Sequence, residues 1–483
     1  MKKTGKYIII MLAVLVVLGG AFAALRLLPT ENEETDSSSS ASSEASASEP
    51  ILDKDMAEVA SVEVVNQEDS YTLLPVKSAG ETVEFTLDGY EDYDLNTALL
   101  TSNVRTLVEL KAVKDLGGQE NLNAFGLGSG APEVTLNYTG GGSDKLVLGD
   151  NAAESVGKYV LKDGVVYVIS GVPVNLFESK FSYFNTELYS VADRMEITED
   201  ENGEEKETVG LDILYSMTLS GAQYPEPVNI EYTSRATSNY LITTPITAES
   251  GNSTFETLMT ALKTLTASAA VDAGITEEKL EQYGLSEPEA EISFNMNDSE
   301  HTLAVSAEDA EGNRYLLADG RDVVYQVSGA TVEAWAESSI SKLRMSYVWI
   351  PNIKNVKKLT VTVDGDQVHA YHITRTKNEE KSTESNIQYD LSIENAGGEA
   401  VDYDEGYQPF YQAVISLAVF SQEESSYSGT ADVKVVYEYF DGGSDTLELY
   451  KLADSNRYAA VLNGGFNGQV RSSEVTAMLD QIP

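Results

Sequence analysis

Several segments of the chain alternate hydrophobic and polar residues with a period of two, which predicts β-strands with one buried face. The clearest are residues 134–138, where Val, Leu and Tyr alternate with polar side chains, and residues 433–439, where Val or Tyr occupies every second position. Turn-forming sequences lie beside such segments: Gly-Gly-Ser-Asp at residues 141–144 and 442–445, and Asp-Gly at residues 163–164. These sequences supply the positive φ angles that tight connections need. The combination predicts β-meanders, in which successive antiparallel strands are joined by short turns.

A second pattern, with hydrophobic residues three and four positions apart, predicts helices in three places. These are residues 96–116, 254–270 and 409–420. Strand-like segments precede each helix, at residues 59–65 and 71–87, residues 212–219 and 228–242, and residues 358–375 and 388–393. Strands, a helix and a meander therefore follow one another in three successive regions, which predicts an α+β fold.

The three regions also share sequence features, which predicts tandem units. An aromatic-Gly-Leu step opens the meander at residues 125–127 and 283–285. A basic residue precedes a tyrosine at Lys158-Tyr159, Arg314-Tyr315 and Arg457-Tyr458. We expect α+β units at residues 53–190, 191–345 and 346–483, each with antiparallel strands plus one main helix followed by a β-meander. The third unit is the most divergent, because only part of the shared pattern recurs there.

The N-terminal segment has the pattern of a membrane span. Residues 7–25 carry no charge, and as a helix they would extend about 28 Å, close to the thickness of a bilayer core. Lysines at positions 2, 3 and 6 would hold the preceding end in the cytoplasm. We therefore expect a transmembrane anchor at residues 1–28. The Ala-Phe-Ala sequence at 21–23 leaves a cleaved signal peptide as the alternative.

Residues 29–52 predict a disordered linker, because Ser, Glu and Ala dominate and residues 31–50 contain no large apolar side chain. A linker after an anchor would tether the folded part just above the membrane. The expected location is therefore the cell membrane, with a single span and the C-terminal bulk outside the cytoplasm.

Charge and cysteine content narrow the classes of function. The chain has 32 basic and 78 acidic residues, a net charge of −46, so it is a poor partner for nucleic acid and for anionic lipid headgroups. It has no cysteine, which excludes disulfides, thiolate nucleophiles, cysteine-based zinc sites, iron–sulfur clusters and a lipoprotein anchor. No cofactor is expected from the sequence, and the oligomeric state is not predicted.

Candidate catalytic motifs are few. His369 and His372 lie three apart on a predicted strand, so they point to opposite faces, and His301 follows a turn. We expect no metal or catalytic role for any of the three. Ser339-Ile340-Ser341-Lys342 fits the Ser-x-x-Lys pair of penicillin-recognising enzymes, but the companion motifs are absent from the sequence.

A glycine-rich segment and two acidic clusters are weaker candidates for binding sites. Gly126, Gly128 and Gly130 lack the spacing of a dinucleotide loop, so we interpret them as a turn. The acidic clusters at residues 88–94 and 402–405 each precede a predicted helix, where carboxylates favour capping. Calcium binding there remains open, although neither cluster has the spacing of an EF-hand. A glycosidase pair among the many carboxylates is also left open.

Residues 283–288, the meander that follows them and the strand at 324–329 resemble the bacterial domain of unknown function 4340. The resemblance is clearest at residues 283–329 and 125–171 and weakest after 346. It implies a single-span exported protein, of a kind often associated with ABC-type transporters like those of gliding motility. It supplies no catalytic residues.

The sequence thus predicts a membrane-tethered extracytoplasmic accessory or binding protein without catalytic activity, working in an ABC-type transport or cell-envelope complex. No catalytic, binding or metal-ligating residue is assigned. The first alternative is a cell-surface glycan- or peptide-binding protein that uses exposed tyrosines, Trp335 or Trp349 as stacking platforms. A hydrolase is the third hypothesis.

Overall fold

The structure is a computed structural model that describes residues 49–76, 83–152, 157–199, 205–382, 387–453 and 455–483. The chain divides into two units, Met1–Glu49 and Pro50–Pro483, and the fold belongs to the second. The predicted anchor at residues 1–28 lies outside the described residues, as does most of the predicted linker at 29–52. Within the described part of the chain, every helix is too short or too polar to cross a membrane.

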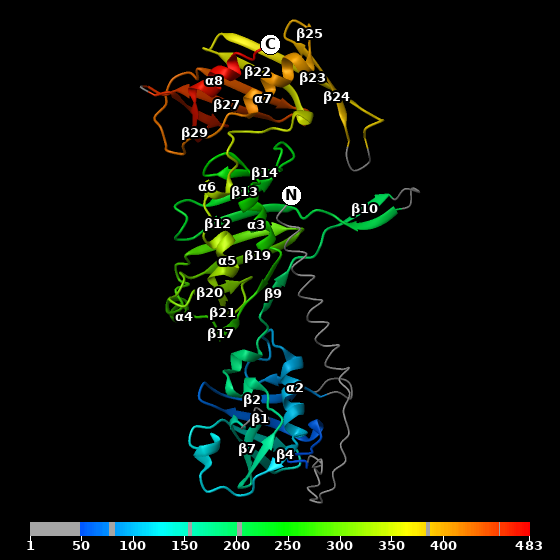
Figure 1. The fold of residues 1–483 in the computed structure, drawn as a ribbon, viewed down its shortest axis with the longest axis vertical. Helices are drawn as coiled ribbons and strands as arrows, with labels where there is room; N and C mark the ends of the chain where they lie inside the picture. The colour runs from blue at the N-terminus through cyan, green and yellow to red at the C-terminus, as the bar shows by residue number, and fades with distance from the viewer. Residues whose placement is uncertain (1–48, 77–82, 153–156, 200–204, 383–386, 454) are drawn as a thin grey trace, which may run out of the picture. The chain divides into compact units, whose positions relative to one another are not determined.

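The first large sheet contains eight antiparallel strands, coloured blue to green in Figure 1. In chain order they are β1 (Val59–Val65), β2 (Ser70–Val76), β3 (Glu84–Leu87), β4 (Ala112–Asp115), β5 (Glu133–Tyr138), β6 (Ser143–Asn151), β7 (Lys158–Lys162) and β8 (Val165–Ile169). Their order across the sheet is β3-β2-β1-β5-β6-β7-β8-β4. Val62 and Val64 of β1 are fully buried, as the alternating pattern requires.

The second large sheet contains nine strands in the order β15-β14-β13-β12-β18-β19-β20-β21-β17. Their bounds are β12 (Leu214–Ser220), β13 (Val228–Tyr232), β14 (Tyr240–Thr244), β15 (Ala248–Ser250), β17 (Ala269–Ala273), β18 (Ala290–Met296), β19 (Ser299–Val305), β20 (Asn313–Ala318) and β21 (Val323–Ser328). All neighbouring pairs in this sheet are antiparallel.

The third large sheet contains eight antiparallel strands in the order β25-β24-β23-β22-β26-β27-β28-β29. They are β22 (Val356–Val363), β23 (Gln367–Lys377), β24 (Tyr389–Asn395), β25 (Ala400–Val401), β26 (Val433–Tyr439), β27 (Ser444–Lys451), β28 (Arg457–Leu462) and β29 (Gly465–Arg471). In all three large sheets the first strand in sequence lies between its hairpin partner and the meander: β1 between β2 and β5, β12 between β13 and β18, and β22 between β23 and β26.

Two small sheets accompany the large ones. The strand β9 (Glu187–Ser190) pairs with β16 (Thr264–Thr266). The strands β10 (Met195–Glu199) and β11 (Glu205–Val209) form a separate two-stranded sheet, and Figure 1 shows this hairpin extending away from the second large sheet. This hairpin is not among the strands predicted from the sequence.

In the residues that the structure describes, helices are few and short. The α-helices are α2 (Thr97–Val108), α3 (Ser253–Ala261), α4 (Glu277–Gln282), α5 (Gly329–Ala336), α6 (Ile340–Leu343), α7 (Gln408–Ile415) and α8 (Ser472–Leu479). A π-helix, η7 (Tyr403–Tyr407), leads into α7, and the short 3-10 helices are η1 (Met56–Glu58), η2 (Leu122–Phe125), η4 (Val174–Phe177), η5 (Lys180–Tyr183) and η6 (Ile353–Asn355). The predicted α+β class is confirmed, with sheets that are mostly antiparallel.

All three helix predictions extended too far, and the helix expected at 409–420 ends at Ile415. The helix expected at residues 96–116 ends at Val108, and β4 follows it. The helix expected at 254–270 ends at Ala261, and β16 and β17 follow. The residues that follow these two helices form strands because β4 pairs with β8, β16 with β9 and β17 with β21. Partners that lie far away in the sequence thus override a local helical pattern.

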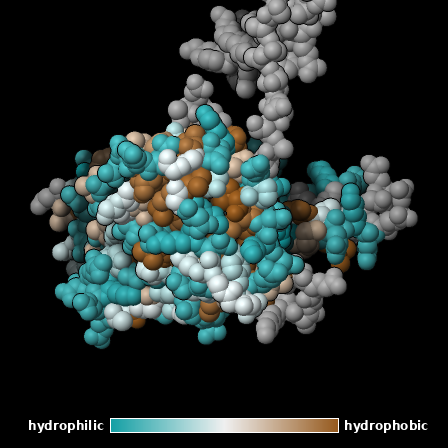
Figure 2. Space-filling model, turned by 90° about the horizontal axis from the view of Figure 1, so that it is seen from below, coloured by the Kyte–Doolittle hydropathy of each residue, from teal (hydrophilic) through white to brown (hydrophobic). Residues whose placement is uncertain are grey.

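The core of the described part of the chain forms two clusters of buried side chains. One cluster runs through the first and second large sheets, and the other belongs mainly to the third sheet. Helix α2 contributes Leu100, Val104, Leu107 and Val108, whose spacing places them on one face. Outside the core, hydrophilic residues cover much of the face shown in Figure 2, with hydrophobic residues in smaller groups between them.

Candidate functional site

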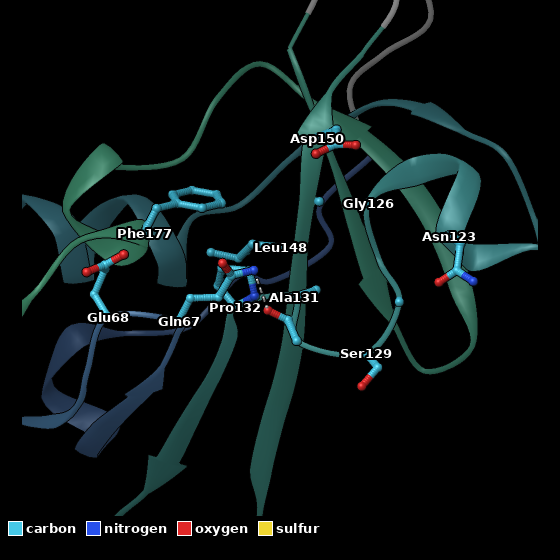
Figure 3. Close-up of a pocket in the computed structure, with 13 residues that line it drawn as sticks. Gln67, Glu68, Asn123, Gly126, Ser129, Ala131, Pro132, Leu148, Asp150 and Phe177 are labelled. Carbon is cyan, nitrogen blue, oxygen red and sulfur yellow. Dashed lines mark hydrogen bonds between the residues drawn. The ribbon is translucent and has the colours of Figure 1, made fainter.

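The glycine-rich turn of the first sheet borders a cavity of about 420 Å³ (Figure 3). Gly126, Gly128 and Gly130 follow η2 and precede β5, so their interpretation as a turn is confirmed. Gly126 has a φ of 68°, and a Cβ there would lie 2.6 Å from Oδ1 of Asp150, so only glycine fits. Gly126 and Gly128 therefore serve close packing of the turn, and Gly130, with a φ of 87° and no atom of the described residues near its Cβ position, serves the backbone conformation of the turn.

The lining of this cavity limits what it could bind. Figure 3 shows Asp150 and Ser129 at opposite ends, with Gln67 and Glu68 across from the turn. The Gln67 side-chain amide donates to the Gly130 carbonyl at 3.3 Å. Carboxylates are present among the described lining residues, but arginine and lysine are not. The cavity thus lacks the positive charge that phosphate recognition normally requires.

A second cavity, of about 580 Å³, has a more apolar wall that includes Tyr224, Ile246, Ile340 and Phe466. The Ser-x-x-Lys motif lies beside it, in and around α6. Nζ of Lys342 donates to the carbonyl of Glu337 at 2.7 Å, and the hydroxyls of Ser339 and Ser341 are hydrogen-bonded to each other at 3.0 Å. Lysine and serine are therefore engaged with different groups in this structure.

The histidines occupy strands. Nδ1 of His301 lies 2.9 Å from Oδ2 of Asp319, and its ring stacks on Tyr189 with centroids 3.9 Å apart. His369 and His372 both lie on β23, as predicted. In the ranges that the structure describes, no group of three His, Asp or Glu side chains is arranged to hold a metal ion.

The two acidic clusters differ in role. At residues 402–405 the capping prediction is confirmed, because Oδ1 of Asp402 accepts from the backbone N–H of Glu405 at 2.7 Å at the start of η7. At residues 88–94 it is wrong, because Asn96 caps α2. Asp94 instead accepts from the Asn185 amide at 2.7 Å and pairs with Arg321 at 3.2 Å. The carboxylate links segments that are distant in sequence.

The tryptophans are not stacking platforms, so that expectation was wrong. Trp335 and Trp349 are each only 2% exposed, and the Trp349 indole N–H donates to the Tyr439 hydroxyl at 3.2 Å. Large indole rings are buried here because they fill the core beside the second and third sheets. Exposed tyrosines do occur, and Tyr215 and Tyr232 lie edge to face with ring centroids 6.4 Å apart.

Buried charged groups lie at the contact between the second and third sheets. Arg344 is 4% exposed and donates to Oδ1 of Asn467 at 2.6 Å, to the Asn467 carbonyl and to the Met345 carbonyl. Burial lowers the pKa of the Arg344 guanidinium to about 10. The two carboxylate oxygens of Glu249 accept from the backbone N–H groups of Ser238 and Ile350. Burial raises the pKa of Glu249, and these hydrogen bonds partly oppose that effect.

The hairpin of β10 and β11, which was not predicted from the sequence, carries hydrophobic residues on the surface. Its exposed large hydrophobic residues are Met195 (53%), Ile197 (69%) and Val209 (63%), followed by Leu211 (84%). The sequence contains a pattern typical of a β-hairpin, because a short alternating segment lies on each side of the Asn-Gly at 202–203. The many acids around these residues make the hydrophobic alternation easy to overlook.

Comparison with known families gives one match. Residues 241–419 match the model of the family described as Domain of unknown function (DUF4340). This confirms the resemblance inferred from the sequence over a range that includes residues 283–329, whereas residues 125–171 lie outside the match. Comparisons with curated proteins and with solved structures give no match.

Proposed function

From the DUF4340 resemblance of residues 241–419, we propose that the chain is a membrane-tethered extracytoplasmic accessory protein without catalytic activity, working in an ABC-type transport or cell-envelope complex. The tether would be residues 1–28, with residues 29–52 as the linker. The folded part would consist of three tandem α+β units at residues 53–190, 191–345 and 346–483.

The observation that carries this proposal is the shared strand order of the three large sheets. Repeated architecture of this kind is typical of proteins that present extended binding surfaces. The backbone conformation of the turn at corresponding positions of the three sheets supports the tandem organisation. Asp163, Asp319 and Asn463 have φ angles of 50°, 51° and 51°, each followed by a glycine with positive φ.

Packing pairs recur between the sheets as well. Phe125 packs edge to face on Tyr159 with centroids 4.9 Å apart, and Tyr283 packs likewise on Tyr315 at 4.7 Å. The Tyr138 hydroxyl donates to Asp144 at 2.8 Å in the first sheet, and the Tyr439 hydroxyl donates to Asp445 at 2.6 Å in the third. The conspicuous shared residues thus serve turns and packing, which supports a presenting role over a chemical one.

Binding of a cell-surface glycan or peptide is the second candidate. Tyr215 and Tyr232 favour it, because partly exposed aromatic rings offer apolar faces with a polar end. Loss of binding to isolated cell-wall material in a Tyr232→Ala variant would support this alternative, and unchanged binding would argue against it.

Co-purification tests the accessory role. The full chain with a C-terminal affinity tag is isolated after gentle solubilisation of membranes, and bound proteins are quantified by mass spectrometry. A matched chain without residues 1–28 is the control. We expect transporter subunits to be enriched with the full chain and depleted with the control. Repeated recovery of the full chain alone would refute the accessory role.

A further inference from the structure

We propose that the apolar face of the β10–β11 hairpin is a docking surface for another protein, whose contact surface is apolar and flanked by lysine or arginine. The inference rests on the accessory role proposed above and names the surface through which that role is carried out.

The register of the hairpin creates two different faces. Met195 pairs with Val209 and Ile197 pairs with Glu207, so these side chains point to one side. Thr198 pairs with Lys206 on the other side, next to the Glu196–Thr208 pair. One face is thus apolar at the end nearest the base of the hairpin, where Met195, Val209 and Ile197 lie, with Glu207 opposite Ile197, and the other face is polar.

The apolar face is uncovered in the structure. Its three apolar side chains, Met195, Ile197 and Val209, are more than half exposed, and Leu211 beyond the end of β11 is 84% exposed. In the described ranges, no third strand pairs with either edge of this hairpin. An isolated two-stranded hairpin is marginally stable in water. Exposed hydrophobic groups rimmed by polar residues commonly mark sites of protein–protein contact.

The base of the hairpin is held firmly. Nζ of Lys263 lies 3.1 Å from Asp193 and 2.7 Å from Asp212, the residues on either side of the hairpin. The side-chain amide of Asn297 donates to Asp212 at 2.7 Å and to the carbonyl of Ala192 at 3.0 Å. A fixed base reduces the ordering cost of binding, because the hairpin is already presented.

Charge selects the class of partner. Residues 196–207 contain seven acidic residues and one lysine. Anionic lipid headgroups would be repelled by such a segment. A second copy of this chain is disfavoured as well, since each copy carries a net charge of −46. A protein surface with basic residues around an apolar groove complements both the charge and the hydrophobicity of the hairpin.

Site-specific photo-crosslinking of the full chain in cells tests the proposal. A photoreactive amino acid is placed at Ile197 on the apolar face, and at Thr198 on the polar face as the matched control. The charge variant is Glu205→Lys with Glu207→Lys. Its control is Glu379→Lys with Glu380→Lys, an exposed acidic pair after β23. Thermal unfolding of each variant checks that the fold is intact, which we expect because these side chains are exposed or, at Thr198, partly exposed.

We expect crosslinks from position 197, and few from 198, to one protein whose crosslinked segment contains lysine or arginine. The hairpin charge variant should lower the yield at least five-fold, and the control pair should leave it unchanged. Crosslinks to lipid, to a second copy of the chain or to an acidic segment would overturn the proposal. If transporter subunits co-purify but position 197 gives no crosslink, the docking surface is refuted and the accessory role stands. If neither is seen, both are refuted.

Discussion

Replacement of Arg344 by methionine tests how the second and third sheets are held together. The guanidinium is buried and donates to three acceptors, two of them on Asn467 in β29. Methionine has a similar length but no donor, so it leaves these acceptors without a partner. The structure therefore predicts a weaker contact at this position and an otherwise unchanged fold.

The expected change in the free energy of unfolding for Arg344→Met follows from two opposing effects. Each unsatisfied buried acceptor costs about 1–3 kcal/mol. Removal of a buried cation recovers part of its desolvation cost, which reaches several kcal/mol in protein interiors. Because burial already lowers the pKa of Arg344 to about 10, this recovery is substantial. We expect a net loss of roughly 2–4 kcal/mol in the free energy of unfolding.

Tryptophan fluorescence during urea unfolding of the full chain in detergent gives the readout. The two tryptophans of the chain, Trp335 and Trp349, lie on either side of Arg344 in sequence and are buried. Lys342→Met is the matched control, because it removes the same charge from an exposed position and should change stability by less than about 0.5 kcal/mol. Equal free energies of unfolding for Arg344→Met and Lys342→Met would refute the reasoning.

The remaining predictions concern the hairpin base and a second buried charge. Lys263→Met should speed amide hydrogen exchange at residues 193–198 and 206–211 while lowering global stability by less than about 1 kcal/mol, since its partners Asp193 and Asp212 are partly exposed; unchanged exchange would contradict this. Burial opposes ionisation of Asp212, but hydrogen bonds from Lys263 and Asn297 hold its pKa in the folded chain below 3.8. The ionised Asp212 therefore stabilises the fold above pH 3.8, and this contribution is lost as the pH falls through the pKa of the folded state. Thermal unfolding between about pH 5 and about pH 2 should therefore lose stability more steeply in the unchanged chain than in Lys263→Met, and parallel curves would count against the assignment. Glu249→Gln should lower the free energy of unfolding by about 1–3 kcal/mol, because both carboxylate oxygens accept backbone N–H groups and an amide can accept with only one; a neutral effect in urea unfolding would show that the pair of hydrogen bonds is not needed.

The parts of the fold that depend on local chemistry were predictable from the sequence. The strand at residues 59–65 was predicted with the bounds of β1, because its alternating residues face a core on one side. The Asp-Gly turns were also predictable, since Asp163 and Asp319 adopt positive φ before glycine. Local sequence determines these features without help from distant partners.

Features that depend on distant pairing were not predictable. Residues 112–115 continue a helical spacing of apolar residues, yet they form β4 because β8 supplies the hydrogen bonds. Trp335 and Trp349 could have been exposed binding residues or core residues, and only packing decides that they are buried. The 88–94 cluster illustrates the same limit for the candidate sites, since Asp94 binds Asn185 and Arg321 rather than capping the helix that follows.

The central claim, a chain tethered to the membrane with its sheets outside the cytoplasm, is tested most directly by labelling a single introduced cysteine. The natural chain has none, and Ser428 is exposed. In intact cells, a membrane-impermeant maleimide should label the Ser428→Cys chain, and the labelled chain should sediment with membranes. Labelling only after cell lysis, with the full-length chain in the soluble fraction, would contradict the account.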